Sequence, residues 1–136
     1  MTTPSTLPVG VVAASLLGVI VIFQLALAAG APWGAAAYGG RAAQDDGRLP
    51  LKYRVASAGT AVILTGALWL VLAAGAVISS ARLSENLLGV GVWVLAGLFA
   101  LNTVGNFAGR HPAERWGAGG VTAALTILCI WIAATR

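Results

Sequence analysis

The chain has 136 residues, of which 59% are hydrophobic and 9% charged, and its formal net charge is +4. Soluble domains are about one quarter charged, whereas mean hydropathy here is +0.90, so the composition excludes an ordinary water-soluble domain. No basic domain stands apart from the apolar segments, which excludes nucleic acid as a partner.

Four apolar runs without Asp, Glu, Lys or Arg follow one another, and each covers about the 20 residues that a helix needs to cross a membrane. Inside a membrane the backbone finds no water to bond with, so each run must be helical to satisfy its own hydrogen bonds. We predict an all-α fold, one membrane domain over residues 1–136 that forms a four-helix transmembrane bundle. The first run is longer than a signal-peptide core, so we expect a retained helix. The predicted helices are 9–30, 55–78, 87–108 and 117–135.

The first predicted loop, residues 31–54, is the longest segment outside these runs. Its stretch AQDDGRLP contains Asp45, Asp46 and Gly47, which favour a turn. We expect this loop to be the contact surface for a membrane or cytoplasmic protein partner.

Three amides lie inside the apolar runs: Gln24 in the first, and Asn102 and Asn106, one turn apart, in the third. An amide in hydrocarbon needs a hydrogen-bond partner, and one interpretation is an interhelical hydrogen bond. The other is a polar cluster that binds a solute or a lipid head group. No carboxylate lies within the runs, which argues against a proton-driven carrier.

The second predicted loop, residues 109–116, reads GRHPAERW. Arg110 continues the four-residue spacing of Asn102 and Asn106, and Glu114 precedes the positive N-terminus of the fourth helix. We expect a tight turn in which Arg110 or Arg115 pairs with Glu114. The candidate ligand-binding residues are Gln24, Asn102, Asn106, Arg110 and Glu114.

Catalytic and metal-binding patterns are missing from the sequence. His111 has no cluster of Cys, His, Asp or Glu around it, so we predict a solvated loop residue and no metal or other cofactor. Cys129 lies in the fourth apolar run, where a small buried side chain is expected rather than a catalytic thiolate.

The distribution of Lys and Arg predicts the orientation of the chain. Two such residues, Arg82 and Arg136, lie on one side of the predicted bundle, and the other six lie in loops 31–54 and 109–116. The positive-inside rule places both loops in the cytoplasm and both termini outside. The basic loops should face anionic lipid head groups.

Small residues are expected where the helices pack in lipid. Projection at about 100° per residue groups small residues on one face of each predicted helix. In the second helix these are Ala56, Gly59, Gly66 and Ala73, and in the third Gly91, Gly105 and Gly109 lie with Asn102. Such faces suit a tight bundle and also contacts in a homo-oligomer.

The order GAPWG, YGGR, LPLKYRVAS, LFALNTVGN and ERWG, followed by a last apolar run, resembles an uncharacterised family of small bacterial four-helix integral membrane proteins. The resemblance covers most of the chain from Gly30 onward. The chain departs from it at Gly109–Arg110, where the family often has Ser-Arg. The resemblance implies the fold and a location in the bacterial inner membrane, and it implies no activity.

These observations favour a non-enzymatic membrane component, either a homo-oligomer or an accessory subunit of a membrane assembly. An alternative is a small transporter or channel for a neutral or anionic solute, with Arg110 at its inner mouth. The third interpretation is a membrane enzyme in which Glu114 or His111 acts on a lipid head group.

Overall fold

A computed structural model of the chain describes residues 6–79 and 82–136. Within these residues the structure is helical and has no strand. Four helices are long and apolar enough to cross a membrane, which confirms the all-α class and the number of long helices. The elements are α1 (Thr6–Ala29), η1 (Gly34–Ala36), η2 (Tyr38–Gly40), α2 (Leu51–Ala74), α3 (Glu85–Phe107), η3 (Ala113–Ala118) and α4 (Gly119–Ala134).

All four helices begin a few residues before the predicted positions, and in α2, α3 and the fourth helix the reason is that charged residues belong to the first turn. Pro50 stands immediately before α2, so Lys52 and Arg54 are helical rather than part of the loop. The Ser84 side chain caps α3 by accepting a hydrogen bond from Leu87 N–H at 3.3 Å, a common way to satisfy a free helix-end donor. The apolar runs therefore located the helices but not their first residues.

The fourth membrane-length helix begins at Ala113, not at residue 117. Its first part, η3, is π-helical and contains Glu114, Arg115 and Trp116. Pro112 precedes it with φ −56°, a value already suitable for a helix. The predicted loop 109–116 is consequently shorter, and Glu114 is part of a helix.

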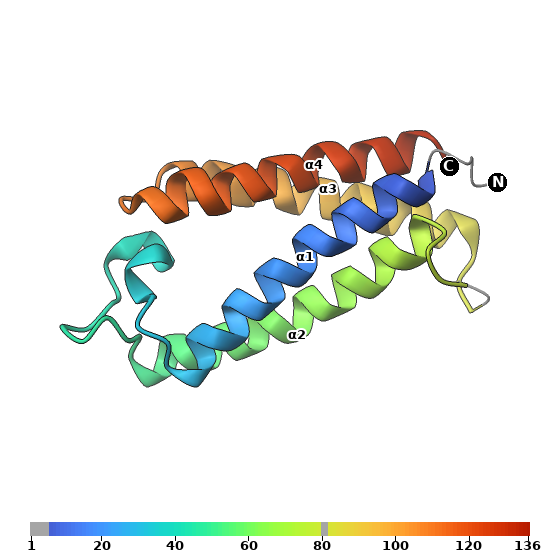
Figure 1. Cartoon of the computed structure of the whole chain (residues 1–136). Coiled ribbons are helices and arrows are strands. Elements are labelled where there is room, and N and C mark those ends of the chain that lie inside the picture. Colours follow the sequence, from blue (N-terminus) through green and yellow to red (C-terminus); the bar gives the residue numbers. More distant parts are fainter. Residues whose placement is uncertain (1–5, 80–81) are drawn as a thin grey trace.

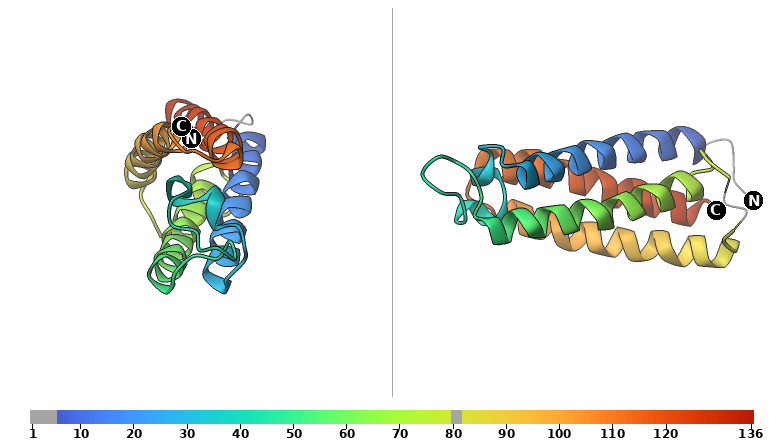
Figure 2. Two further views of the ribbon diagram at one scale, coloured as in Figure 1. Left: turned by 90° about the vertical axis from the view of Figure 1, so that its left-hand side faces the viewer. Right: turned by 90° about the horizontal axis from the view of Figure 1, so that it is seen from below.

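The molecule consists of two antiparallel hairpins. The most extensive contacts join α1 to α2 and α3 to α4, and those between the hairpins are fewer. The hairpins pack together at the terminal end of the bundle, which holds Thr6 and Arg136, and diverge toward the loop end, which holds residues 30–50 and 108–112 (Figures 1 and 2). This divergence separates the helices where the predicted amides lie.

The main hydrophobic core fills the space between the hairpins toward the terminal end. Its fully buried members include Leu17, Val71, Val92 and Leu125. Cys129 is also fully buried in this core, as predicted for a packing residue. At the same end Arg136 contacts both the carbonyl of Ala74 and the carboxylate of Glu85, and so ties α2 and α3 to the C-terminus.

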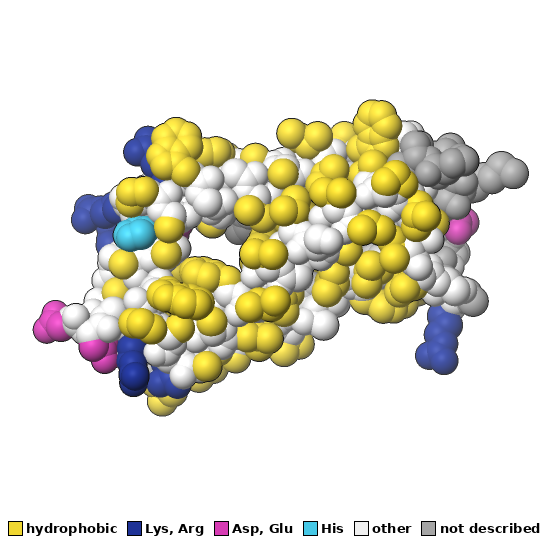
Figure 3. All heavy atoms as spheres, in the orientation of Figure 1, with side chains coloured by type: hydrophobic (Ala, Val, Ile, Leu, Met, Phe, Trp, Pro, Cys, Tyr) yellow, Lys and Arg dark blue, Asp and Glu magenta, His cyan; other side chains and the backbone are white. Residues whose placement is uncertain are grey.

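The outward surface of the long helices is apolar along most of its length (Figure 3). Val62 is 74% exposed and Leu101 is 71% exposed. Large exposed aliphatic side chains on all four helices are costly in water but suit a lipid environment.

The predicted small-residue faces are correct only in part. A Cβ on Gly10 would lie 2.8 Å from the Cα of Gly75, so the α1 and α2 backbones meet there. In contrast, a Cβ on Gly59, Gly66 or Gly105 would meet no atom within 4 Å. Of the residues predicted for the α2 face, Ala73 is buried, and it shares the buried face with Ser57, Ala61, Ala67, Val71 and Ala74.

The loop between α1 and α2 folds back onto the protein rather than extending into solvent. Ala37 and Leu49 form a small second core with Leu27 of α1. The loop thereby occupies the space between the diverging hairpin ends (Figure 1). The sequence did not predict this packing, and the expected contact of the loop with a protein partner stays a prediction.

Candidate functional site

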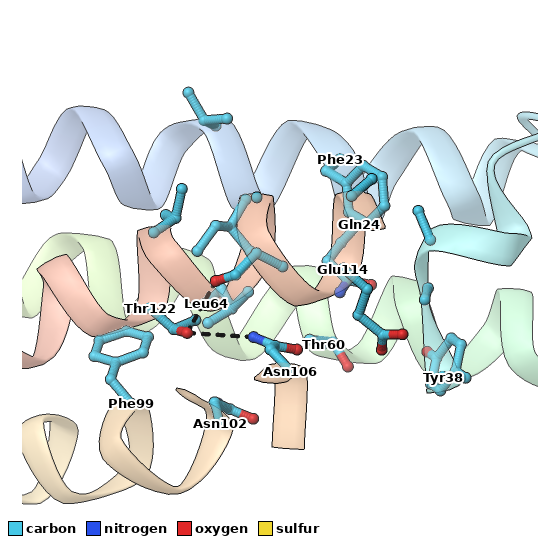
Figure 4. A pocket seen from close by; sticks show the side chains of 18 residues that line it. Phe23, Gln24, Tyr38, Thr60, Leu64, Phe99, Asn102, Asn106, Glu114 and Thr122 are labelled. Carbon is cyan, nitrogen blue, oxygen red and sulfur yellow. Dashed lines mark hydrogen bonds between the residues drawn. The ribbon is translucent and has the colours of Figure 1, made fainter. Parts of the chain in front are cut away.

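A cavity of about 410 Å³ lies between the two hairpins at the loop end. Residues from α1, the η1–η2 loop, α2, α3 and the η3–α4 helix contribute to its wall (Figure 4). Phe99 and Leu64 line it and also pack in or against the main core, so they separate the cavity from the terminal end. Figure 3 shows an opening between α1 and α4 that is bordered by hydrophobic side chains.

Glu114 places its carboxylate in the cavity wall. The residue is only 6% exposed, and its Oε1 accepts a hydrogen bond from Gly39 N–H at 3.0 Å. Its Oε2 is buried without a hydrogen-bond partner. The expected pairing with Arg110 or Arg115 was wrong: both arginines are exposed, and neither forms an ion pair with Glu114 among the described residues.

Two glycines allow Glu114 to take this position. A Cβ on Gly109 would lie 2.5 Å from Glu114 Oε2, so the carboxylate rests against a position that only glycine leaves open. Gly39 has φ +74°, a left-handed conformation that glycine adopts without a steric penalty. The turn at Gly39 thus donates a hydrogen bond to the carboxylate, and the turn at Gly109 leaves space for it.

Gln24 contributes a second free acceptor. It lines the cavity from α1, and its Oε1 is buried without a hydrogen-bond partner. The sequence had left two interpretations for this amide. The interhelical hydrogen bond to Oε1 is not formed with any described residue, and Gln24 lines the cavity with an unpaired, buried amide oxygen (Figure 4).

Asn106 and Asn102 differ from each other although both line the cavity. Asn106 Nδ2 donates to Thr122 Oγ1 at 3.3 Å, and Thr103 Oγ1 lies 3.1 Å from the same hydroxyl. These contacts are interhelical bonds between α3 and α4, as one of the two interpretations predicted for Asn106. Asn102 is exposed and has no side-chain hydrogen bond within the described part of the chain.

Arg110 does not line the cavity, contrary to its predicted place at a mouth. A Cβ on Gly40 would lie 3.9 Å from the Arg110 Cβ, so Arg110 stands beside the η2 turn. The chain turns between Ala108 and Pro112, which breaks the four-residue spacing from Asn106. His111 is exposed as predicted, and its Nδ1 accepts a hydrogen bond from Ala113 N–H at 3.1 Å.

Tyr38 is the main cavity residue that sequence reasoning missed. It has φ +52°, an unusual conformation for a residue other than glycine. A 2.9 Å hydrogen bond joins its hydroxyl to Ser57 Oγ, and its ring centroid lies 5.0 Å from that of Tyr53. In the sequence this tyrosine resembles the aromatic residues that lie at a membrane–water boundary. No sequence periodicity connects it with Glu114.

No family model, curated protein or solved structure significantly matches the chain. The resemblance to small bacterial membrane proteins therefore stays a prediction.

The cavity offers one carboxylate, side-chain amides and hydroxyl groups within a largely apolar wall. Glu114 is the only Asp, Glu, His, Lys or Arg among the described residues that line it. No group of three or more His, Cys, Asp or Glu side chains is suited to a metal ion in residues 6–79 and 82–136. The arrangement can hold a molecule that brings hydrogen-bond donors and an apolar part.

Proposed function

We propose that this chain is a multi-pass protein of a bacterial inner membrane that acts without catalysis and binds a small amphiphilic molecule between its hairpins. The four apolar helices and their aliphatic outer surface support insertion in lipid. The six Lys and Arg residues at or near the loop end support a cytoplasmic position for it, next to anionic lipid head groups.

The observation that carries the proposal is the pair of buried, unpartnered oxygens, Glu114 Oε2 and Gln24 Oε1, in one cavity. A buried acceptor without a partner costs about 1–3 kcal/mol, and more when it is charged. The cost falls when a bound molecule supplies donors to both oxygens. The cavity is also within the usual size range of ligand pockets, roughly 300–1,000 Å³.

The same geometry favours a binding function over the two alternatives, a membrane enzyme and a transporter or channel. A carboxylate that works as a general acid or base usually acts with a second titratable group, whereas the only such group beside Glu114 in the described lining, the Tyr38 hydroxyl, is hydrogen-bonded to Ser57. The packed core beyond Phe99 and Leu64 argues against a transport path for a solute through a single copy of the protein. Association with further copies or with another membrane protein stays a prediction.

Filling the cavity should prevent ligand retention. Thr60 lines the cavity, and its hydroxyl bonds only to its own helix, at the carbonyl of Ala56. We expect Thr60→Phe to remove about nine tenths or more of the amphiphile that co-purifies with the wild type, because the ring occupies the space that the ligand needs. Native mass spectrometry of protein purified in a mild non-ionic detergent, followed by extraction and identification of the bound molecule, measures this occupancy.

Ile63→Phe is the matched control, since Ile63 lies in the same helix and is 73% exposed on its outer surface. It should keep wild-type occupancy and wild-type thermal stability. Equal occupancy of the same molecule in the wild type and both variants would show that retention occurs on the outer surface, and the proposal would then be wrong.

A further inference from the structure

We infer that the molecule bound in this cavity carries an ammonium head group with N–H donors, attached to an apolar chain. The inference rests on the proposed function and specifies its ligand. It starts from Glu114, which is more than nine-tenths buried, lines the cavity and has one carboxylate oxygen, Oε2, without a hydrogen-bond partner (Figure 4).

No residue in 6–79 or 82–136 forms an ion pair with this carboxylate. The ion pairs within the described residues are Arg48 with Asp46 and Arg136 with Glu85. Glu114 receives one backbone hydrogen bond from Gly39 and the partial positive charge of the η3 N-terminus. A ligand cation would therefore provide the charge that is missing inside the cavity.

Three basic residues of the loop end make contacts elsewhere, and Arg110 is exposed and does not line the cavity. Arg54 donates from Nε to the carbonyl of Ala28 at 3.0 Å. Arg115 stacks its guanidinium over Trp116 at 5.7 Å, and Lys52 lies 5.1 Å from the Tyr53 ring. None of these cations is among the residues that line the cavity.

The polar groups select a donor-bearing cation. Gln24 Oε1 and Glu114 Oε2 are both acceptors, and a hydrogen bond between an ionised donor and a carboxylate is about twice as strong as a neutral one. The amides of Gln24, Asn102 and Asn106 also bring N–H donors, one of which bonds to Thr122, but these groups are neutral, so Glu114 is the only full charge among the described lining residues. An ammonium with several N–H groups satisfies more than one acceptor, which an anionic head group cannot do.

The remaining wall favours the other half of an amphiphile. Phe23, Phe99 and Tyr38 line the cavity together with aliphatic side chains such as Val19 and Ile20. Aromatic faces attract ammonium groups, and Val19 and Ile20 belong to α1, the helix that borders the opening between α1 and α4 (Figure 3). This opening gives an alkyl chain a route to the surrounding lipid while the head group stays at Glu114.

The test compares four single-chain probes of equal length: dodecylamine, dodecyltrimethylammonium, dodecanol and dodecyl sulfate. Binding to the full-length protein in a mild non-ionic detergent is measured by native mass spectrometry and by the shift in thermal unfolding. We expect dodecylamine to bind best. Glu114→Gln keeps an acceptor for Gly39 N–H but removes the charge, and it should weaken dodecylamine binding about tenfold or more while leaving dodecanol binding within about twofold.

Glu85→Gln is the matched control, because Glu85 lies at the terminal end and does not line the cavity. It should bind all four probes like the wild type. If Glu114→Gln does not fold, Gly109→Ala provides the second variant, since its methyl group would displace the carboxylate that rests against Gly109. Wild-type affinity for dodecylamine in both Glu114→Gln and Gly109→Ala, or a wild-type preference for dodecyl sulfate, would contradict the inference.

The source of the ammonium group is resolved with nanodiscs of phosphatidylglycerol alone or with an equal amount of phosphatidylethanolamine. Retention of phosphatidylethanolamine identifies a lipid head group. Selective binding of dodecylamine without such retention identifies a single-chain amine. Both results support the inference.

Failure of this inference differs from failure of the proposed function. If Thr60→Phe abolishes the binding of dodecanol and dodecylamine, and the wild type binds the two equally, only the ammonium head group is contradicted. If no probe responds to Thr60→Phe, the cavity is not a binding site and both proposals are wrong.

Discussion

Gly10 and Gly75 show how single residues determine the approach of helices in this protein. Each lies so close to the backbone of the other that a Cβ on either would be within 3 Å of the partner's Cα. Close approach of this kind replaces the hydrophobic driving force that helices lack in lipid. Glycine is therefore required at this contact for packing, and not for a special backbone conformation.

We expect Gly10→Ala to lower the free energy of unfolding by about 1–3 kcal/mol, because the added methyl group meets the backbone of α2 rather than a flexible side chain. Unfolding in mixed micelles with increasing dodecyl sulfate measures the change. The control is Gly18→Ala in the same helix, where a Cβ meets no atom within 4 Å. Equal stability of the two variants would contradict the described contact.

At the scale of elements, α3 and α4 are joined by a polar contact as well as by apolar packing. The Thr122 hydroxyl lies within hydrogen-bonding distance of Asn106 and of Thr103. Interhelical bonds between polar side chains in membrane proteins average about 0.6 kcal/mol and reach about 1.7 kcal/mol. This contact keeps the hairpin closed beside the cavity.

Thr122→Val preserves the side-chain shape and removes both interhelical bonds, so we expect a loss of about 1–2 kcal/mol in the free energy of unfolding. The same micelle titration measures it. Thr126→Val is the comparison, because the Thr126 hydroxyl bonds only to the Thr122 carbonyl of its own helix. A larger loss in Thr126→Val than in Thr122→Val would show that the α3–α4 contact contributes nothing.

For the whole molecule, the unequal ends of the bundle are the main feature. The hairpins pack through the main core at the terminal end, whereas at the loop end they enclose the cavity and are bridged by the folded η1–η2 loop. Most of the Lys and Arg residues are at the loop end. From the positive-inside rule we therefore expect the cavity to lie toward the cytoplasmic leaflet.

This orientation can be measured with single cysteines in a Cys129→Ala background. Asp45→Cys, at an exposed position of the loop end, should resist a membrane-impermeant maleimide in intact cells and react after the cells are permeabilised. Arg82→Cys, exposed at the opposite end, should react in intact cells. The reverse pattern would place the cavity in the outer leaflet.

The sequence by itself determined the four long helices, because a backbone without water must satisfy its own hydrogen bonds, and uncharged runs of this length show where that happens. It also identified Gln24, Asn102, Asn106 and Glu114, since polar groups are conspicuous in and beside such runs. All four line the cavity. Arg110, assigned to the same group by its spacing, does not.

Only the tertiary structure decided which faces meet, how far the hairpins diverge, and that Tyr38, Thr60 and Phe23 share a wall with Glu114. The physical reason is that side chains facing lipid are as apolar as those facing another helix, so hydrophobicity does not distinguish the two. The small residues of the sequence allowed several helix faces to be the packing face. The structure shows that one such contact is made by Gly10 and Gly75. The burial of Glu114 likewise depends on Gly39, which lies far from it in the sequence.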